Sequence, residues 1–153
     1  MKLEKIYKQL GIWLKARLLL SLYMGIALYV SFWILELFGM EIPSKASLAL
    51  IFGVLNIVPY IGNIVGGIPP ILLWLTHFWV LGGLIITWIL LVINAIENNV
   101  IVPLMMNKSL GINSVVIFIS MILGGIIMGF LGILLAVPIA AIVTLLFEKE
   151  LTD

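Results

Sequence analysis

Two long apolar runs, residues 18–38 and 78–102, constrain the fold of this chain more than any other feature. About 20 apolar residues are enough for a helix to cross the hydrocarbon core of a bilayer. The chain as a whole is 64% hydrophobic and 10% charged, whereas a soluble domain is about half apolar and about a quarter charged. The sequence therefore predicts an all-α, polytopic membrane protein.

Composition also excludes several classes of function. The net charge is +1 and no basic stripe is present, so we expect no nucleic acid partner. The chain has no cysteine and one histidine, His77, which lies between aromatic residues at an expected membrane interface. No nucleophile–base set or paired intramembrane carboxylates can be assembled, so we predict neither an enzyme nor a metal site or cofactor.

The two ends of the chain set the expected orientation. Residues 1–17 place apolar side chains on one helical face and lysines off it, which predicts a cytoplasmic amphipathic helix in the membrane interface. A solvated helix of a larger soluble part is the alternative. Seven of the eight basic residues fall on the cytoplasmic side if both termini and the segment after residue 102 are cytoplasmic, as the positive-inside rule favours. Residues 148–153 then form a cytoplasmic tail.

Two further apolar segments of the membrane domain (residues 18–147) are interrupted, which predicts broken hairpins at 46–77 and 114–147. Residues 46–58 reach only about 20 Å as a helix and end at the sequence PYIGNIVGGIPP. Two short arms around such a tip favour a re-entrant hairpin, and a single kinked span over 46–77 is the alternative. The expected tip residues are Pro59, Gly62, Gly66, Gly67, Gly124, Gly125, Gly129 and Gly132.

The spacing of these glycines suggests an internal repeat. Gly62-x-x-x-Gly66 in the first tip and Gly125-x-x-x-Gly129 in the second are 63 residues apart, about the separation of the two clear spans. Hairpins that enter from opposite sides would make the halves an inverted repeat, as in many secondary transporters. Glycine pairs are also common in membrane helices for close packing, so chance spacing stays open.

A few polar residues interrupt the apolar segments and predict a site. On residues 78–102, Thr87, Asn94, Glu97 and Asn98 lie along one helical face, which should contact protein or water rather than lipid. No basic residue lies within a helical turn of Glu97, so its expected partners are amides, a cation or a proton. The alternatives are a solvated carboxylate at the inner interface and amides that only tie helices together. The candidate binding residues are Asn56, Tyr60, Asn63, Asn94, Glu97 and Asn98.

Three segments, LNIVPYIGNIVGGIPP, IENNVIVPLMMNKSLGI and MILGGIIMGFLGILLAVPIAA, together resemble the AI-2E family of bacterial membrane transporters. The resemblance implies export of a small polar solute such as autoinducer-2, or sodium(lithium)–proton antiport. It also implies a homo-oligomer, for which a pentamer is one option, in the bacterial inner membrane. Family members carry further spans ahead of this region, so the chain resembles their C-terminal half. A non-transporting subunit that assembles with a missing N-terminal half is the other reading.

Overall fold

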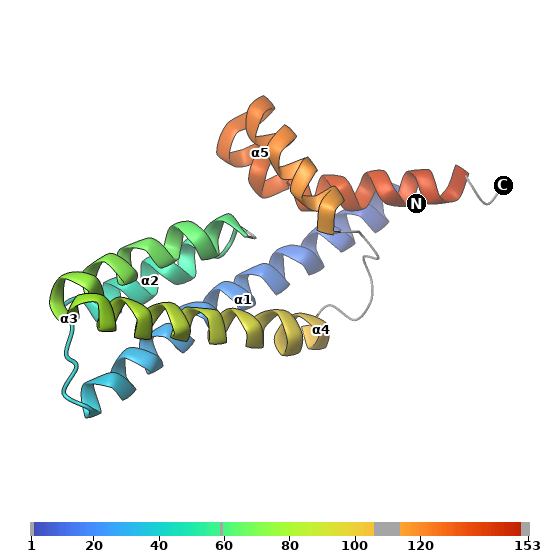
Figure 1. The fold of residues 1–153 in the computed structure, drawn as a ribbon. Helices are drawn as coiled ribbons and strands as arrows, with labels where there is room; N and C mark the ends of the chain where they lie inside the picture. The colour runs from blue at the N-terminus through green and yellow to red at the C-terminus, as the bar shows by residue number, and fades with distance from the viewer. Residues whose placement is uncertain (1, 59, 106–113, 151–153) are drawn as a thin grey trace. The chain divides into compact units, whose positions relative to one another are not determined.

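A computed structural model describes residues 2–58, 60–105 and 114–150, and every regular element in them is helical (Figure 1). Three stretches are long and apolar enough to cross a membrane, namely Gly11–Leu37, Ile61–Ile101 and Val115–Ile133. The predicted all-α, polytopic membrane class is therefore confirmed. The elements are α1 (Lys2–Leu37), α2 (Lys45–Leu55), α3 (Ile61–Ile96), the π-helix η1 (Glu97–Ile101), α4 (Val102–Met105) and α5 (Ser114–Glu150).

The chain forms two compact units, which we describe separately. The central unit comprises residues 17–105, and the terminal unit comprises residues 1–16 with 106–153. Helix α1 runs without interruption from Lys2 to Leu37, so the expected boundary between a tail helix and the first span is not a break in the helix. No proline or turn sequence separates residues 1–17 from 18–38, and leucine, lysine, alanine and arginine at the junction all favour helix. The interfacial position of the tail stays a prediction.

Helix α2 and the first part of α3 form a helical hairpin in the central unit (Figure 1). The break between them is shorter than expected, because α3 already begins at Ile61 and runs through Pro69 and Pro70. These prolines leave the carbonyls one turn earlier without their helical donors, a loss that helices in membrane proteins tolerate. The chain therefore reverses between the end of α2 at Leu55 and the start of α3 at Ile61, instead of along the whole Gly/Pro-rich stretch.

Helix α3 doubles back at Phe78 and Trp79 (Figure 1). Trp79 has φ 57° and ψ −156°, a region of backbone conformation that is essentially restricted to glycine. Each arm of α3 holds about 17 residues and is about 25 Å long. The arms are in close contact beside the reversal, where a Cβ atom on Gly82 would lie 2.7 Å from the carbonyl oxygen of Trp74.

Helix α5, in the terminal unit, doubles back in the same way at Gly129, which has φ 60° and ψ −139° (Figure 1). Gly124 and Gly132 face each other across this reversal, and a Cβ atom on Gly132 would lie 1.8 Å from the oxygen of Gly124. In backbone conformation, Gly129 therefore matches Trp79. The predicted 63-residue offset instead pairs Gly129 with Gly66, which lies inside a helix. The pairs Gly62/Gly66 and Gly125/Gly129 therefore do not occupy equivalent places in the structure. They do not support the inverted repeat, which stays a prediction.

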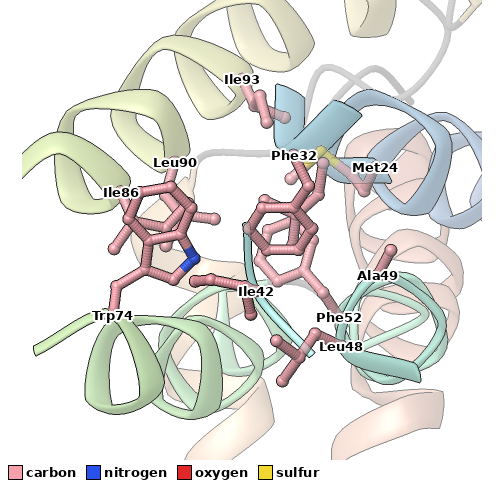
Figure 2. Packing of buried hydrophobic residues seen from close by; sticks show 11 residues of the cluster. Met24, Phe32, Ile42, Leu48, Ala49, Phe52, Trp74, Ile86, Leu90 and Ile93 are labelled. Carbon is pink, nitrogen blue, oxygen red and sulfur yellow. The ribbon is translucent and has the colours of Figure 1, made fainter. Parts of the chain in front are cut away.

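A buried apolar cluster holds the central unit together (Figure 2). Phe32 of α1 stacks on Trp74 of the first α3 arm, with ring centroids 6.1 Å apart. The cluster contains residues of α1, the loop before α2, α2 and both arms of α3. It therefore packs the hairpin of α2 and the first α3 arm against α1 and the second α3 arm. Its members are Met24, Leu28, Phe32, Ile42, Leu48, Ala49, Phe52, Trp74, Ile86, Leu90 and Ile93.

Small residues bring α1 and α2 into backbone contact. Ser21 and Gly25 of α1 face Ala49 and Gly53 of α2, and a Cβ atom on Gly53 would lie 3.0 Å from the oxygen of Ser21. The Ser21 hydroxyl donates a hydrogen bond of 2.6 Å to the Gly53 carbonyl. Pairs of small residues four apart are the usual means of close helix packing in membranes. This contact fixes the orientation of α2 relative to α1, and so the position of the turn that follows α2.

Trp79→Gly should raise the stability of the protein by about 1 kcal/mol, because it removes a strained conformation at a side chain that is 83% exposed. Trp88→Gly is the matched control, because Trp88 is 69% exposed but lies inside the second arm of α3. It should lower stability by about 1 kcal/mol through helix propensity. Thermal unfolding in detergent measures both variants, and an equal loss of stability in the two would contradict the strain at Trp79.

Candidate transport site

Glu97 is a buried carboxylate, 4% exposed, at the end of α3. Here the helix widens into the π-helix η1, in which the N–H of Val102 donates to the Glu97 carbonyl five residues earlier. Single π-helical turns are often found at functional sites, because the wider turn changes which side chains face inward. In this turn Glu97 faces the protein, whereas Asn98 and Asn99 are exposed.

Arg17 of α1 is the cationic partner of Glu97. Its Nη1 lies 3.8 Å from Glu97 Oε1, and the arginine is only 9% exposed. This pair was not predicted from the sequence, because only basic residues within one helical turn of Glu97 were considered as partners. The available signal was that Arg17 and Glu97 both lie near the expected inner ends of their spans, which can place them at one depth.

The turn between α2 and α3 also reaches this ion pair. Arg17 Nε donates a hydrogen bond of 3.3 Å to the carbonyl of Ile57. Tyr60, which precedes α3, lies close enough to Arg17 to interact electrostatically and has φ 59° and ψ −55°, a rare and strained combination. Arg17 therefore links α1, the hairpin turn and the end of α3.

Three buried oxygen atoms in the central unit accept no hydrogen bond from the described residues. They are Oδ1 of Asn63, Oδ1 of Asn94 and Oε2 of Glu97. The orientation of the Asn94 amide is fixed, because its Nδ2 donates to the Leu90 carbonyl at 2.8 Å. Asn94 lies one turn before Glu97, and Asn63 of α3 faces the Glu97 carboxylate. Buried acceptors without donors are costly, so a ligand, a proton or water is expected to complete this group.

The other predicted binding residues differ in burial and in their contacts. Asn56 is buried, but its Nδ2 donates to the Phe52 carbonyl at 2.7 Å, so that donor is already used. Tyr60 is 46% exposed beside Arg17. Asn98 was expected on the same face as Glu97, and this placement is wrong. Successive residues of a helix lie about 100° apart, so Asn98 lies on the exposed side of the helix beside the buried Glu97, and its Nδ2 donates to the Asn94 carbonyl.

The predicted tip residues also divide into distinct groups. Gly62, Gly66 and Gly67 are buried in the first turns of α3, not in a broken tip. Gly62 packs against the end of α2, where an added Cβ atom would lie 2.1 Å from the Leu55 oxygen. Gly124, Gly125, Gly129 and Gly132 lie at the reversal of α5, and Pro59 lies outside the described residues.

This arrangement suits charge exchange on the carboxylate. At 3.8 Å the Arg17–Glu97 contact is an ion pair longer than a direct charge-assisted hydrogen bond. The carboxylate can take up a proton, and its second oxygen and the two amide oxygens can accept a hydrogen bond from a hydroxyl group or bind a hard monovalent cation. The site therefore combines buried acceptors with one protein cation, Arg17.

Comparisons with known proteins agree with a transport role. The sequence profile of the family described as AI-2E family transporter matches residues 2–151. The chain is 32% identical over 140 residues to the putative transport protein YrrI of Bacillus subtilis (strain 168), which covers 92% of this chain and 38% of that protein. It is 29% identical over 146 residues to the putative transport protein YhhT of Escherichia coli (strain K12), covering 95% and 40%. The AI-2 transport protein TqsA of the same strain is 35% identical over 95 residues, covering 62% and 28%. The chain thus spans about two fifths of the length of the first two relatives.

Proposed function

Because the chain belongs to the AI-2E family of transporters, we propose that it forms part of a secondary transporter whose coupling group is Glu97. The observation that carries this proposal is the Glu97 carboxylate itself, which is buried in a membrane protein and paired on one oxygen only. A carboxylate at this depth is costly, and such residues usually mark ion or proton pathways.

Coupling requires that Glu97 exist in two states with different partners. In one state its charge is balanced by Arg17. In the other state a proton or a monovalent cation neutralises the carboxylate, and the amide oxygens of Asn63 and Asn94 complete the new ligand set. A solute whose movement depends on this exchange is coupled to the gradient of that ion.

We propose a small polar solute such as autoinducer-2 as the cargo, moving outward. The support is the relative TqsA, which is named an AI-2 transport protein. Sodium(lithium)–proton antiport is the second candidate, because the three unpaired oxygens also suit a monovalent cation. The proposed setting is the bacterial inner membrane with both termini cytoplasmic, in a homo-oligomer such as a pentamer. Because the chain spans two fifths of its relatives, a subunit that acts only in assembly is a third candidate.

Flux measurements in proteoliposomes test the proposal. A gradient of autoinducer-2 or of sodium should drive proton movement, read by an entrapped pH-sensitive dye, only when the protein is present. Glu97→Gln keeps the shape of the side chain and removes its charge, so it should reduce this flux to the level of protein-free vesicles. Asn98→Ala, at an exposed neighbouring amide, should leave it unchanged. Equal flux in Glu97→Gln and the parent would refute coupling through Glu97, and no flux in the parent would favour the assembly subunit.

A further inference from the structure

The coupling role of Glu97 does not by itself explain why a buried arginine is needed. Arg17 is 9% exposed, and its guanidinium contacts two different elements, with Nη1 3.8 Å from Glu97 and Nε 3.3 Å from the Ile57 carbonyl. Glu97 ends α3, and Ile57 lies in the turn after α2. One side chain of α1 therefore connects the carboxylate to the hairpin turn.

The other hydrogen bonds of the hairpin turn lie within the hairpin itself. The backbone N–H groups of Asn56, Ile57 and Val58 donate to carbonyls of α2 itself, so these bonds lie within the hairpin. The N–H groups of Gly62 and Ile64 in α3 donate to the Val58 and Tyr60 carbonyls, which are bonds within the same hairpin. Among the hydrogen bonds of the described residues, that from Arg17 is the one that joins the turn backbone to a helix outside the hairpin. The turn is also strained at Tyr60. Loss of the Arg17 contact should therefore free the turn to change its conformation.

We propose that Arg17 is a positioning residue that latches the hairpin turn in place while Glu97 is charged, and that it releases the turn when a proton or cation neutralises Glu97. The proposal rests on the proposed coupling role of Glu97 and adds the means by which the charge of Glu97 controls the hairpin. It makes Arg17 the residue that converts an exchange of charge into a movement of the protein.

The charges around Arg17 favour release. When Glu97 loses its charge, Arg17 becomes a buried cation without a counter-ion, a state that is strongly unfavourable. The arginine stem is long enough to carry the guanidinium to water at the membrane surface, which breaks its bond to Ile57. Besides Arg17, Tyr23 faces Glu97, and Tyr60 faces Arg17.

Reactivity of a buried thiol in the turn tests the latch. The chain has no cysteine, and Val58 is 4% exposed, so Val58→Cys introduces a single protected thiol. Its reaction with N-ethylmaleimide is measured at one fixed pH in the full chain in membranes. Adding Glu97→Gln or Arg17→Gln should each speed the reaction about tenfold, which corresponds to about 1.4 kcal/mol of opening free energy. The two changes together should add nothing further, because both break the same latch.

Two controls separate release of the turn from general loosening. Ala49→Cys, also 4% exposed but in α2 and packed on α1, should react at the same slow rate in every background. Arg17→Lys keeps the charge but loses the guanidinium that contacts both partners, so it should give less than half of the increase.

The latch is wrong if Arg17→Gln leaves the rate at position 58 unchanged, or if position 49 speeds up equally. Transport measured in the same variants distinguishes this failure from failure of the coupling proposal. Lost transport in Glu97→Gln with an unchanged rate at position 58 would overturn the latch and retain coupling. Normal transport in Glu97→Gln with a tenfold faster rate would retain the latch and overturn coupling.

Discussion

Gly62→Ala should prevent the hairpin between α2 and α3 from forming and lower stability by about 3 kcal/mol or more. An added Cβ atom would lie 2.1 Å from the Leu55 oxygen and 2.6 Å from the Asn56 Cα atom. Both are backbone atoms, so no change of rotamer relieves the overlap and the turn itself must open. The midpoint of thermal unfolding in detergent measures this loss.

Two other glycines provide graded controls. A Cβ atom on Gly66 would meet the ring of Phe52 at 3.1 Å, and a side chain can move, so Gly66→Ala should cost clearly less. Gly11 has no atom within 4 Å of the added Cβ, so Gly11→Ala should be neutral or stabilise α1 by up to about 1 kcal/mol. Unfolding of Gly62→Ala at the parent temperature would show that α2 and α3 do not meet as described.

Arg17→Met should destabilise the protein by about 3–5 kcal/mol, because it leaves the buried Glu97 carboxylate without its cation. Adding Glu97→Gln should recover most of this loss, because the double variant Arg17→Met/Glu97→Gln has no unpaired buried charge. The double-mutant cycle, measured by chemical or thermal unfolding in detergent, isolates this coupling. Additive losses in the two single variants would mean that Arg17 and Glu97 do not form a pair.

The sequence predicted the membrane class, the short apolar arm that forms α2 and a Glu97 side chain that faces protein, because each rests on local composition and helical spacing. It could not predict Arg17 as the partner, since Arg17 and Glu97 are 80 positions apart and meet only after α1 and α3 pack. The outward placement of Asn98 also escaped prediction. Asn98 and Glu97 lie about 100° apart around the helix, and the sequence does not show that the protein covers only the side that carries Glu97.

The difference between local sequence signals and tertiary packing also explains why only one of the two chain reversals was predicted. Gly129 was named as a tip residue because glycine permits a positive φ. The matching reversal at Trp79 carries no such signal, because tryptophan disfavours that conformation and tertiary packing imposes it. The Gly/Pro-rich stretch after Tyr60 was predicted to be a broken tip, but it is helical. Its glycines serve close packing of α3 on α2, and its prolines are accommodated inside the helix.

The most direct test of a coupling role for Glu97 is the charge displacement that follows a rapid solute or sodium jump on protein adsorbed to a supported membrane. This measurement suits a chain that spans two fifths of its relatives, because it detects the binding step without a complete transport cycle. The parent and Asn98→Ala should give a transient current, and Glu97→Gln should give none. A transient of equal size in Glu97→Gln would contradict the assignment of Glu97 as the coupling group.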